Sequence, residues 1–162
     1  MELARPAHGD DLGTLTELLT LALAAARTMR GGATLAADAT PAQLLERWNG
    51  PRDASGNADT DGPRDALLVV GEFHQAVVGL GAAVALPSHS GLSGRIECCF
   101  VESEARGVGV GSALMESMVA WCSERGCTDI DALALPGDRS TKQRLEAAGF
   151  TARLLTLNRR LN

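Results

Sequence analysis

Residues 96–115 read IECCFVESEARGVGVGSALM, and this stretch decides the fold. The apolar run 96–101 predicts a strand, which a short polar turn separates from the glycine-rich segment 106–111. After the glycines, apolar side chains recur at the spacing of one helix face, at Leu114, Met115, Met118, Val119 and Cys122. The sequence therefore predicts a strand, a loop and an amphipathic helix in direct succession.

The glycines of the loop indicate an anion site where the helix begins. Gly107, Gly109 and Gly111 leave backbone N–H groups unobstructed, and a helix start carries unpaired donors and the positive pole of its dipole. Ser112 adds a hydroxyl donor in the first turn, and Arg106 adds a cation beside it. This chemistry suits a phosphate or a pyrophosphate.

The spacing of the loop separates three kinds of phosphate-binding motif. A Walker A loop requires a lysine after its last glycine, but Ser112 follows Gly111. In the dinucleotide fingerprint Gly-x-Gly-x-x-Gly, the third glycine would fall on Ser112. The third pattern, Arg/Gln-x-x-Gly-x-Gly/Ala, is matched by Arg106, Gly109 and Gly111. Here the sequence resembles the GNAT superfamily of N-acetyltransferases, whose loop holds the pyrophosphate of acetyl-CoA. A glycine-rich turn that only connects a strand to a helix is the alternative for the loop taken alone.

The residues after the helix extend this resemblance over 96–157. Gly126 suits the left-handed position after a helix end, and 129–135 alternates as a strand that Pro136 and Gly137 end. Asp138 is predicted to cap a last helix over 139–148, and 152–157 is predicted to be a final strand. This order of elements is similar to the second half of GNAT proteins.

The first half of the chain is predicted to supply the acceptor side of the site. Residues 1–6 predict a first strand, and Asp10 is the expected cap of a helix that turns Leu12, Leu15, Leu18, Leu19 and Ala22 inward. A capping box at Thr40–Gln43 predicts a helix to Trp48, and 50–65 is expected to be a mobile loop. Strands over 66–73 and 76–86 are predicted to form an antiparallel hairpin beside the Ile96 strand.

Length and composition fit one domain over residues 1–162 and limit its partners. The 162 residues are 45% hydrophobic and 22% charged, which is ordinary for a single globular domain. A net charge of −5 without a long basic run argues against nucleic acid and suits a cationic small molecule. The longest apolar stretch, 18–26, is too short to span a bilayer and follows acidic residues instead of a basic leader. We therefore expect a cytoplasmic protein with no membrane partner, and a homodimer stays open.

The four cysteines indicate free thiols and no metal. They form no Cys-x-x-Cys pair, and no histidine cluster completes a ligand set. Cys98 and Cys99 are neighbours on the predicted strand, so their side chains are expected to face opposite sides of the sheet.

The resemblance implies a fold, a donor and a set of binding residues. The fold is a single GNAT-like α/β domain whose mixed, mostly antiparallel central sheet contains a splayed parallel strand pair and is flanked by helices. The donor is acetyl-CoA, whose pantetheine pairs with the freed backbone of Cys99 to Val101, while the N–H of Val101 or Phe100 faces the thioester. Asp138 stands where the family often has an asparagine that contacts pantetheine, and Lys142 one turn on would reach a CoA phosphate. The expected cofactor-binding residues are Cys99, Phe100, Val101, Arg106, Gly107, Val108, Gly109, Val110, Gly111, Ser112, Asp138 and Lys142.

Two features concern catalysis. Many GNAT members carry a tyrosine acid on the last helix, but this chain has no tyrosine, and Leu145 stands at that position. Glu97 is preferred as the base, because a carboxylate in an apolar strand is costly unless it is paired or functional, and we expect it on the same strand face as Cys99 and Val101. The other candidates are Glu102, His74 and Asp131. A salt bridge is the structural alternative for Glu97. The expected activity is acetyl transfer from acetyl-CoA to a primary amine by direct attack in a ternary complex; the alternative is a non-catalytic acyl-CoA-binding sensor or regulatory module of the same fold.

Overall fold

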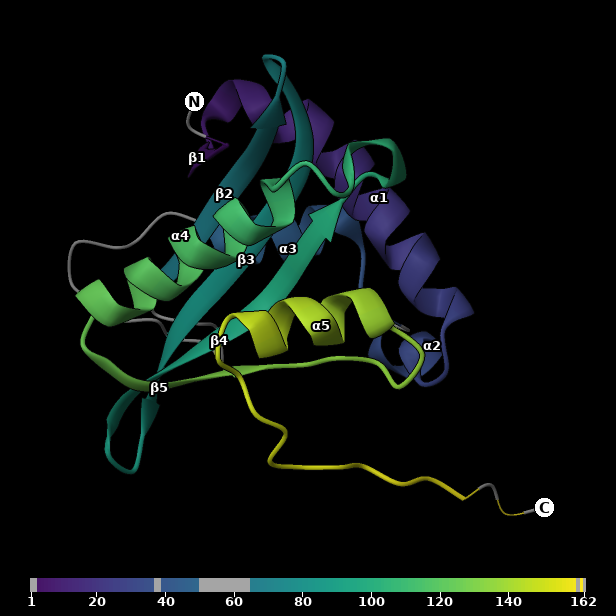
Figure 1. The fold of residues 1–162 in the computed structure, drawn as a ribbon, viewed down its shortest axis with the longest axis vertical. Coiled ribbons are helices and arrows are strands. Elements are labelled where there is room, and N and C mark those ends of the chain that lie inside the picture. The colour runs from purple at the N-terminus through teal and green to yellow at the C-terminus, as the bar shows by residue number, and fades with distance from the viewer. Residues whose placement is uncertain (1–2, 37–38, 50–64, 160, 162) are drawn as a thin grey trace.

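A central sheet with the strand order β1-β2-β3-β4-β5 organises the molecule, as the computed structural model shows for residues 3–36, 39–49, 65–159 and 161 (Figure 1). Its strands are β1 (Ala4–Pro6), β2 (Asp65–Phe73), β3 (Ala76–Ser88), β4 (Gly91–Val101) and β5 (Cys127–Ala132). Neighbouring strands are antiparallel except for β4 and β5, which are parallel. The expected single α/β domain with a mixed, mostly antiparallel sheet is therefore confirmed.

Helices cover both faces of this sheet (Figure 1). They are α1 (Leu12–Thr28), α2 (Gly32–Leu35), α3 (Pro41–Asn49), α4 (Val110–Glu124) and α5 (Arg139–Ala147), with 3-10 turns at Gly9–Asp11 and Ser103–Ala105. One core lies beneath α1 and α3 and includes Leu15, Trp48 and Leu80. The other lies beneath α4 and includes Leu114 and Met118. The apolar side chains of α1 and α4 thus pack against the two faces of the sheet, as the apolar periodicity of these helices predicted.

The β2–β3 hairpin turns at His74 and Gln75, as predicted. Both residues have positive φ angles, 50° and 67°. Two consecutive left-handed residues form the tight turn whose twist matches that of the flanking strands. The sheet is thereby continuous from β2 through β3 to β4.

A β-bulge at Glu97 changes the facing of β4. Ala82 pairs with Cys98 and Ala83 pairs with Ile96, so Glu97 is the extra residue on β4. Ile96 packs in the core beneath α4, whereas Cys98 packs in the core beneath α1. Cys98 and Cys99 face opposite sides, as predicted. The prediction that Glu97 shares a face with Cys99 and Val101 is wrong, because the extra residue breaks the two-residue period that it assumed.

The parallel pair β4–β5 separates after a short ladder. Pairing runs from Leu92–Cys127 to Ile96–Ala132, and the part of β4 from Glu97 onward has no partner on the β5 side among the described residues. This is the splayed strand pair that the family resemblance implied.

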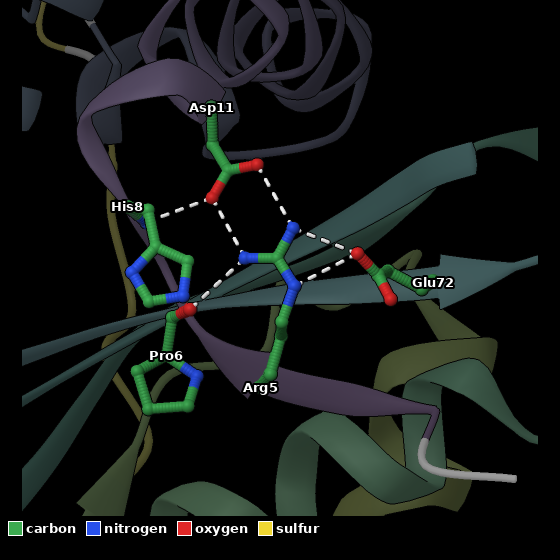
Figure 2. A network of polar contacts seen from close by, with 5 residues as sticks. All are labelled: Arg5, Pro6, His8, Asp11 and Glu72. Atoms are coloured by element: carbon green, nitrogen blue, oxygen red, sulfur yellow. Dashed lines mark hydrogen bonds and ion pairs between the residues drawn. The ribbon is translucent and has the colours of Figure 1, made fainter. Parts of the chain in front are cut away.

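A network around Arg5 fixes β1 and the start of α1 to the sheet (Figure 2). The Arg5 guanidinium donates to both carboxylate oxygens of Asp11, at 2.8 and 3.0 Å, and to Glu72 on β2 at 2.8 Å. Asp11 also accepts the backbone N–H of His8 at 2.7 Å. The predicted cap Asp10 is wrong, because its neighbour Asp11 occupies the N-cap position of α1 and makes these contacts.

Other boundaries differ from the sequence prediction. Leu12 is 37% exposed, and Leu23 takes its place on the buried stripe of α1. The strand expected at 129–135 begins at Cys127 and ends at Ala132. The strand expected at 152–157 does not form: these residues are exposed and run away from the body of the molecule (Figure 1). The expected loop 50–65 lies outside the described residues except for Asp65, which begins β2.

Candidate functional site

A cleft of about 210 Å³ opens where β4 and β5 separate. Its β4 wall is formed by 96–101, and α1 with Leu35 of α2 forms an apolar wall on one side. The remaining wall comes from the end of β5, the loop after it and the inner face of α5. The residues that the sequence predicted for the site and that line this cleft are Glu97, Cys99, Phe100, Val101, Arg106 and Asp138.

The glycine loop leads into α4 in the way its sequence predicts. Gly107 and Gly109 have φ angles of 83° and 95°, which favour glycine, and Gly109 is the N-cap of α4. The first intrahelical bond at this end joins the N–H of Ala113 to the carbonyl of Gly109 at 3.0 Å. The N–H groups of the first helical residues, 110–112, therefore lack helical acceptors and are free to bind an anion.

The rest of the loop stands just outside the cleft. Residues 107–112 do not line it, but Arg106 does. The Arg106 Nε donates to the Val101 carbonyl at 3.2 Å, so this cation marks the point where the free part of β4 ends.

The free edge of β4 offers backbone donors to the cleft. The Glu102 N–H donates to the Val78 carbonyl at 2.9 Å, and this direction faces β3. Because N–H directions alternate along a strand, those of Cys99 and Val101 turn to the side that β5 has left. Phe100 then directs its N–H toward β3, so Val101 is the better placed of the two expected thioester donors.

Glu97 is held by two residues of α3. Its carboxylate oxygens accept the Trp48 Nε1–H and a hydrogen of Arg47 Nη2, each at 2.8 Å. The Glu97 side chain is 12% exposed, and it reaches the cleft from the α1 and α3 face of the sheet. The salt bridge that the sequence left as an alternative therefore exists, and it leaves the carboxylate at the cleft wall.

The helix α5 forms as predicted and carries Asp138 at its start. Asp138 accepts the N–H of Thr141 at 3.0 Å, and it also accepts the hydroxyls of Thr141 and Ser140. Burial raises the pKa of Asp138, but these hydrogen bonds outweigh it and hold the pKa below its usual value. Lys142 does not line the cleft: its ammonium lies in solvent, 3.8 Å from Glu146.

Sequence reasoning missed Arg144, whose side chain enters the cleft from α5. Its Nη1 donates to the Cys99 Sγ at 3.7 Å. A signal was present, because Asp138, Thr141 and Leu145 mark the inward face of α5 and Arg144 follows Thr141 by three residues. Leu145, at the position of the family's tyrosine, is 7% exposed and packs in the core.

Other kinds of site are not seen in the described ranges. There, His, Cys, Asp and Glu side chains nowhere gather in a group of three or more that suits a metal ion. No helix in the same ranges is both long enough and apolar enough to cross a membrane.

Comparison with solved structures shows the same fold in proteins of low sequence identity. A ribosomal-protein-alanine N-acetyltransferase from Brucella melitensis biovar Abortus 2308 is 19% identical, with a TM-score of 0.66 over 98% of this chain and 99% of that one. A transcriptional regulator from Bacillus halodurans C-125 is 18% identical, with a TM-score of 0.68 over 98% of each chain. A predicted acetyltransferase with acetyl-CoA from Clostridium acetobutylicum is 16% identical, with a TM-score of 0.64 over 96% of this chain and 94% of that one.

The sequence itself identifies the family. No curated protein matches the chain. The family model of the acetyltransferase (GNAT) family matches residues 33–150, which include β2 to β5, the glycine loop, α4 and α5. With the splayed strands and the glycine loop in place, the chain belongs to the acetyltransferase (GNAT) family.

Proposed function

We propose that the protein transfers the acetyl group of acetyl-CoA to a primary amine, by direct attack in a ternary complex. The observation that carries this proposal is the separation of β4 from β5 beside a cleft that reaches Arg106, just before the glycine loop and the N-terminus of α4. The free backbone at Cys99 and Val101 suits the amide groups of pantetheine, and the unpaired N–H groups at 110–112 suit a pyrophosphate. The residues present thus fit acetyl-CoA as donor substrate. Four free cysteines fit a reducing compartment, and we place the reaction in the cytoplasm.

The acceptor would enter from the side of α1 and α2. The side chains of that wall are small or apolar: Ala22, Ala25, Ala26, Met29 and Leu35. Leu133 and Leu135, from the segment after β5, also line the cleft. Such a wall favours an amine with an apolar body. The net charge of −5 favours approach of a cation.

Glu97 is proposed as the base that receives the proton of the attacking ammonium, directly or through water. An alkylamine has an unperturbed pKa of about 10.4, so its proton must be removed before attack. Glu97 stands at the cleft wall, and the bonds from Trp48 and Arg47 orient its carboxylate while leaving further lone pairs free.

A second candidate function is a sensor that binds acyl-CoA without turnover. The absence of any tyrosine and the burial of Leu145 favour it, because the family's usual acid is missing. Thiol release from acetyl-CoA over a panel of amines tests both candidates. The panel should contain apolar monoamines, polyamines, amino acids and peptide N-termini. Release with at least one amine supports the transferase, whereas calorimetric binding of acetyl-CoA with no release over the whole panel supports the sensor.

The variant Glu97→Gln should lower kcat by about 100-fold, the usual contribution of a positioned base, and leave acetyl-CoA affinity nearly unchanged. The matched control is Arg47→Met, which breaks the same ion pair but keeps the carboxylate. If both variants lose similar stability and keep kcat within a few-fold of the unmodified protein, Glu97 serves only structure.

A further inference from the structure

Arg144 holds an unusual place for a cation. Its guanidinium lies between the first turn of α4 and the strand β4. A Cβ added at Gly111 would lie 2.7 Å from the Arg144 Nε and 2.9 Å from its Cζ. The Nη1 reaches the Cys99 Sγ at 3.7 Å. The missing side chain of Gly111 therefore leaves the space through which Arg144 points to the free part of β4.

The guanidinium is poorly partnered in this position. Among the described residues it forms no ion pair, and its one hydrogen-bond acceptor is the sulfur of Cys99. A thiol is a weak acceptor, and a half-buried cation without a stronger partner is costly. The charge of Arg144 helps to lower the pKa of Asp138, but the two residues form no ion pair, and the Asp138 oxygens accept hydrogen bonds from Thr141 and Ser140. The position of the Arg144 guanidinium therefore suits an anionic group of a bound ligand.

We propose that Arg144 contacts the sulfur of acetyl-CoA and stabilises the thiolate that leaves during acetyl transfer. This role rests on the proposed function. The cation takes over part of the task for which the family uses a tyrosine, since Leu145 cannot perform it. It does so by charge and hydrogen bonding, without giving up its own proton.

Acetyl transfer begins with attack by the neutral amine on the thioester. The nitrogen lone pair of the neutral amine forms a bond to the acetyl carbonyl carbon, and the carbonyl π electrons move onto its oxygen. When this electron pair re-forms the carbonyl, the carbon–sulfur bond breaks and its electrons leave with the sulfur as a thiolate beside Arg144. The nitrogen, which gave one proton to Glu97 before the attack, gives a second proton to water as the amide forms, and solvent later protonates the thiolate.

The surroundings show why a thiolate needs such a cation here. Burial raises the pKa of the Cys99 thiol, whereas the charge and the hydrogen bond of Arg144 lower it. The pKa of Cys98, which faces away from Arg144 into the other core, is also raised by burial. A CoA thiol beside Cys99 would meet the same desolvation and depend on the same guanidinium.

The test titrates the thiol of bound CoA by the ultraviolet absorbance of its thiolate. The complex with desulfo-CoA serves as the blank, because it cancels the protein's own cysteines. Arg144→Met keeps an apolar stem and removes the charge, Arg144→Lys restores a charge, and Arg139→Met is the control on the exposed side of α5. Thermal unfolding of each variant verifies that it is folded.

We expect Arg144→Met to weaken ionisation of the bound thiol at least about tenfold, one pKa unit, and to lower kcat in parallel. Arg144→Lys should recover part of both losses, and Arg139→Met should change neither. An unchanged titration overturns the proposal. So does an equal loss of affinity for CoA and desulfo-CoA with an unshifted thiol, which would assign Arg144 to a phosphate. If the unmodified protein binds no CoA at all, the proposed function fails, and this result is distinct from the other two.

Discussion

Asp11 shows how one residue couples charge to the fold. It is 8% exposed, and the hydrogen bonds from Arg5 are the main reason why its pKa is lowered to about 2. Burial opposes this shift, and the N–H of His8 adds to it. Because Arg5 also binds Glu72, the same guanidinium joins the start of α1 to β2 (Figure 2). A carboxylate whose pKa is lowered in the folded state stabilises that state only while it is ionised.

Asp11→Asn should therefore lower the free energy of unfolding at neutral pH by about 2 kcal/mol, the value of a shift of nearly two pKa units. In the unmodified protein this contribution is complete above the unfolded-state pKa of 3.8 and is lost as the pH falls toward 2. Urea unfolding at a series of pH values measures both effects. The control Asp10→Asn changes an exposed neighbour. Equal pH dependence of Asp11→Asn and the unmodified protein would contradict the assignment.

At the scale of elements, α4 is bounded by two glycines of similar conformation. Gly109 precedes it with a φ of 95°, and Gly126 follows it with a φ of 75°. Either position strains a residue with a side chain. They differ in surroundings, since only Gly109 belongs to the loop that the proposed pyrophosphate site uses.

Gly109→Val should weaken acetyl-CoA binding at least about tenfold, or 1.4 kcal/mol, because the branched side chain crowds the approach to the α4 N-terminus. Gly126→Val should lose comparable stability but retain the affinity, because nothing lies within 4 Å of the Cβ that it adds. Calorimetric titration of folded protein measures both. Unchanged affinity in Gly109→Val would remove the pyrophosphate assignment from this loop.

At the scale of the whole molecule, the segment after α5 stands apart from the domain (Figure 1). Leu154, Leu155 and Leu157 are 90%, 75% and 84% exposed. Its polar attachment is Arg153, which donates to Asp131 at 2.5 Å on the surface of β5. An exposed ion pair of this kind contributes little to stability, whereas a run of exposed leucines favours association.

Truncation after Phe150 should change the free energy of unfolding by less than about 1 kcal/mol. It should also reduce concentration-dependent self-association in sedimentation velocity. A full-length variant with Leu155→Ser and Leu157→Ser separates the leucines from the loss of chain length, and it should reproduce the reduced association. A large loss of stability on truncation would show that the segment packs on the domain in solution.

The elements that the sequence predicted correctly are those with local causes. The hairpin turn at His74, the capping box at Thr40 and the cap at Asp138 each depend on neighbours within a few residues. The failures concern contacts that a local pattern of residue types does not reveal. Residues 152–157 have a strand-like pattern but no partner strand among the described residues. Asp11 stands at the N-cap of α1, but its side chain accepts from Arg5 and from the His8 N–H and makes no cap bond to that helix.

The candidate site followed the same division. The glycine loop was recognisable from its spacing, and the structure places it at the start of α4, as the sequence predicted. The position of Arg144 depends on the absence of a side chain at Gly111, 33 residues away in the chain. The contacts of Glu97 depend on a bulge that no alternation of residue types reveals.

That bulge makes the number of residues in β4 as important as their kind. Before Glu97 the even-numbered positions, Gly94 and Ile96, face α4; after it the odd-numbered positions, Cys99 and Val101, do. Deleting Glu97, with every other residue kept, would remove the bulge and leave β4 as a strand with regular alternation of its two sides. Ile96, Cys99 and Val101 would then still lie beneath α4, and Cys98 would still point toward α1. Deletion of Glu97 therefore keeps the two sides of the strand, whereas a one-residue insertion that forms no bulge would exchange them for the rest of the strand.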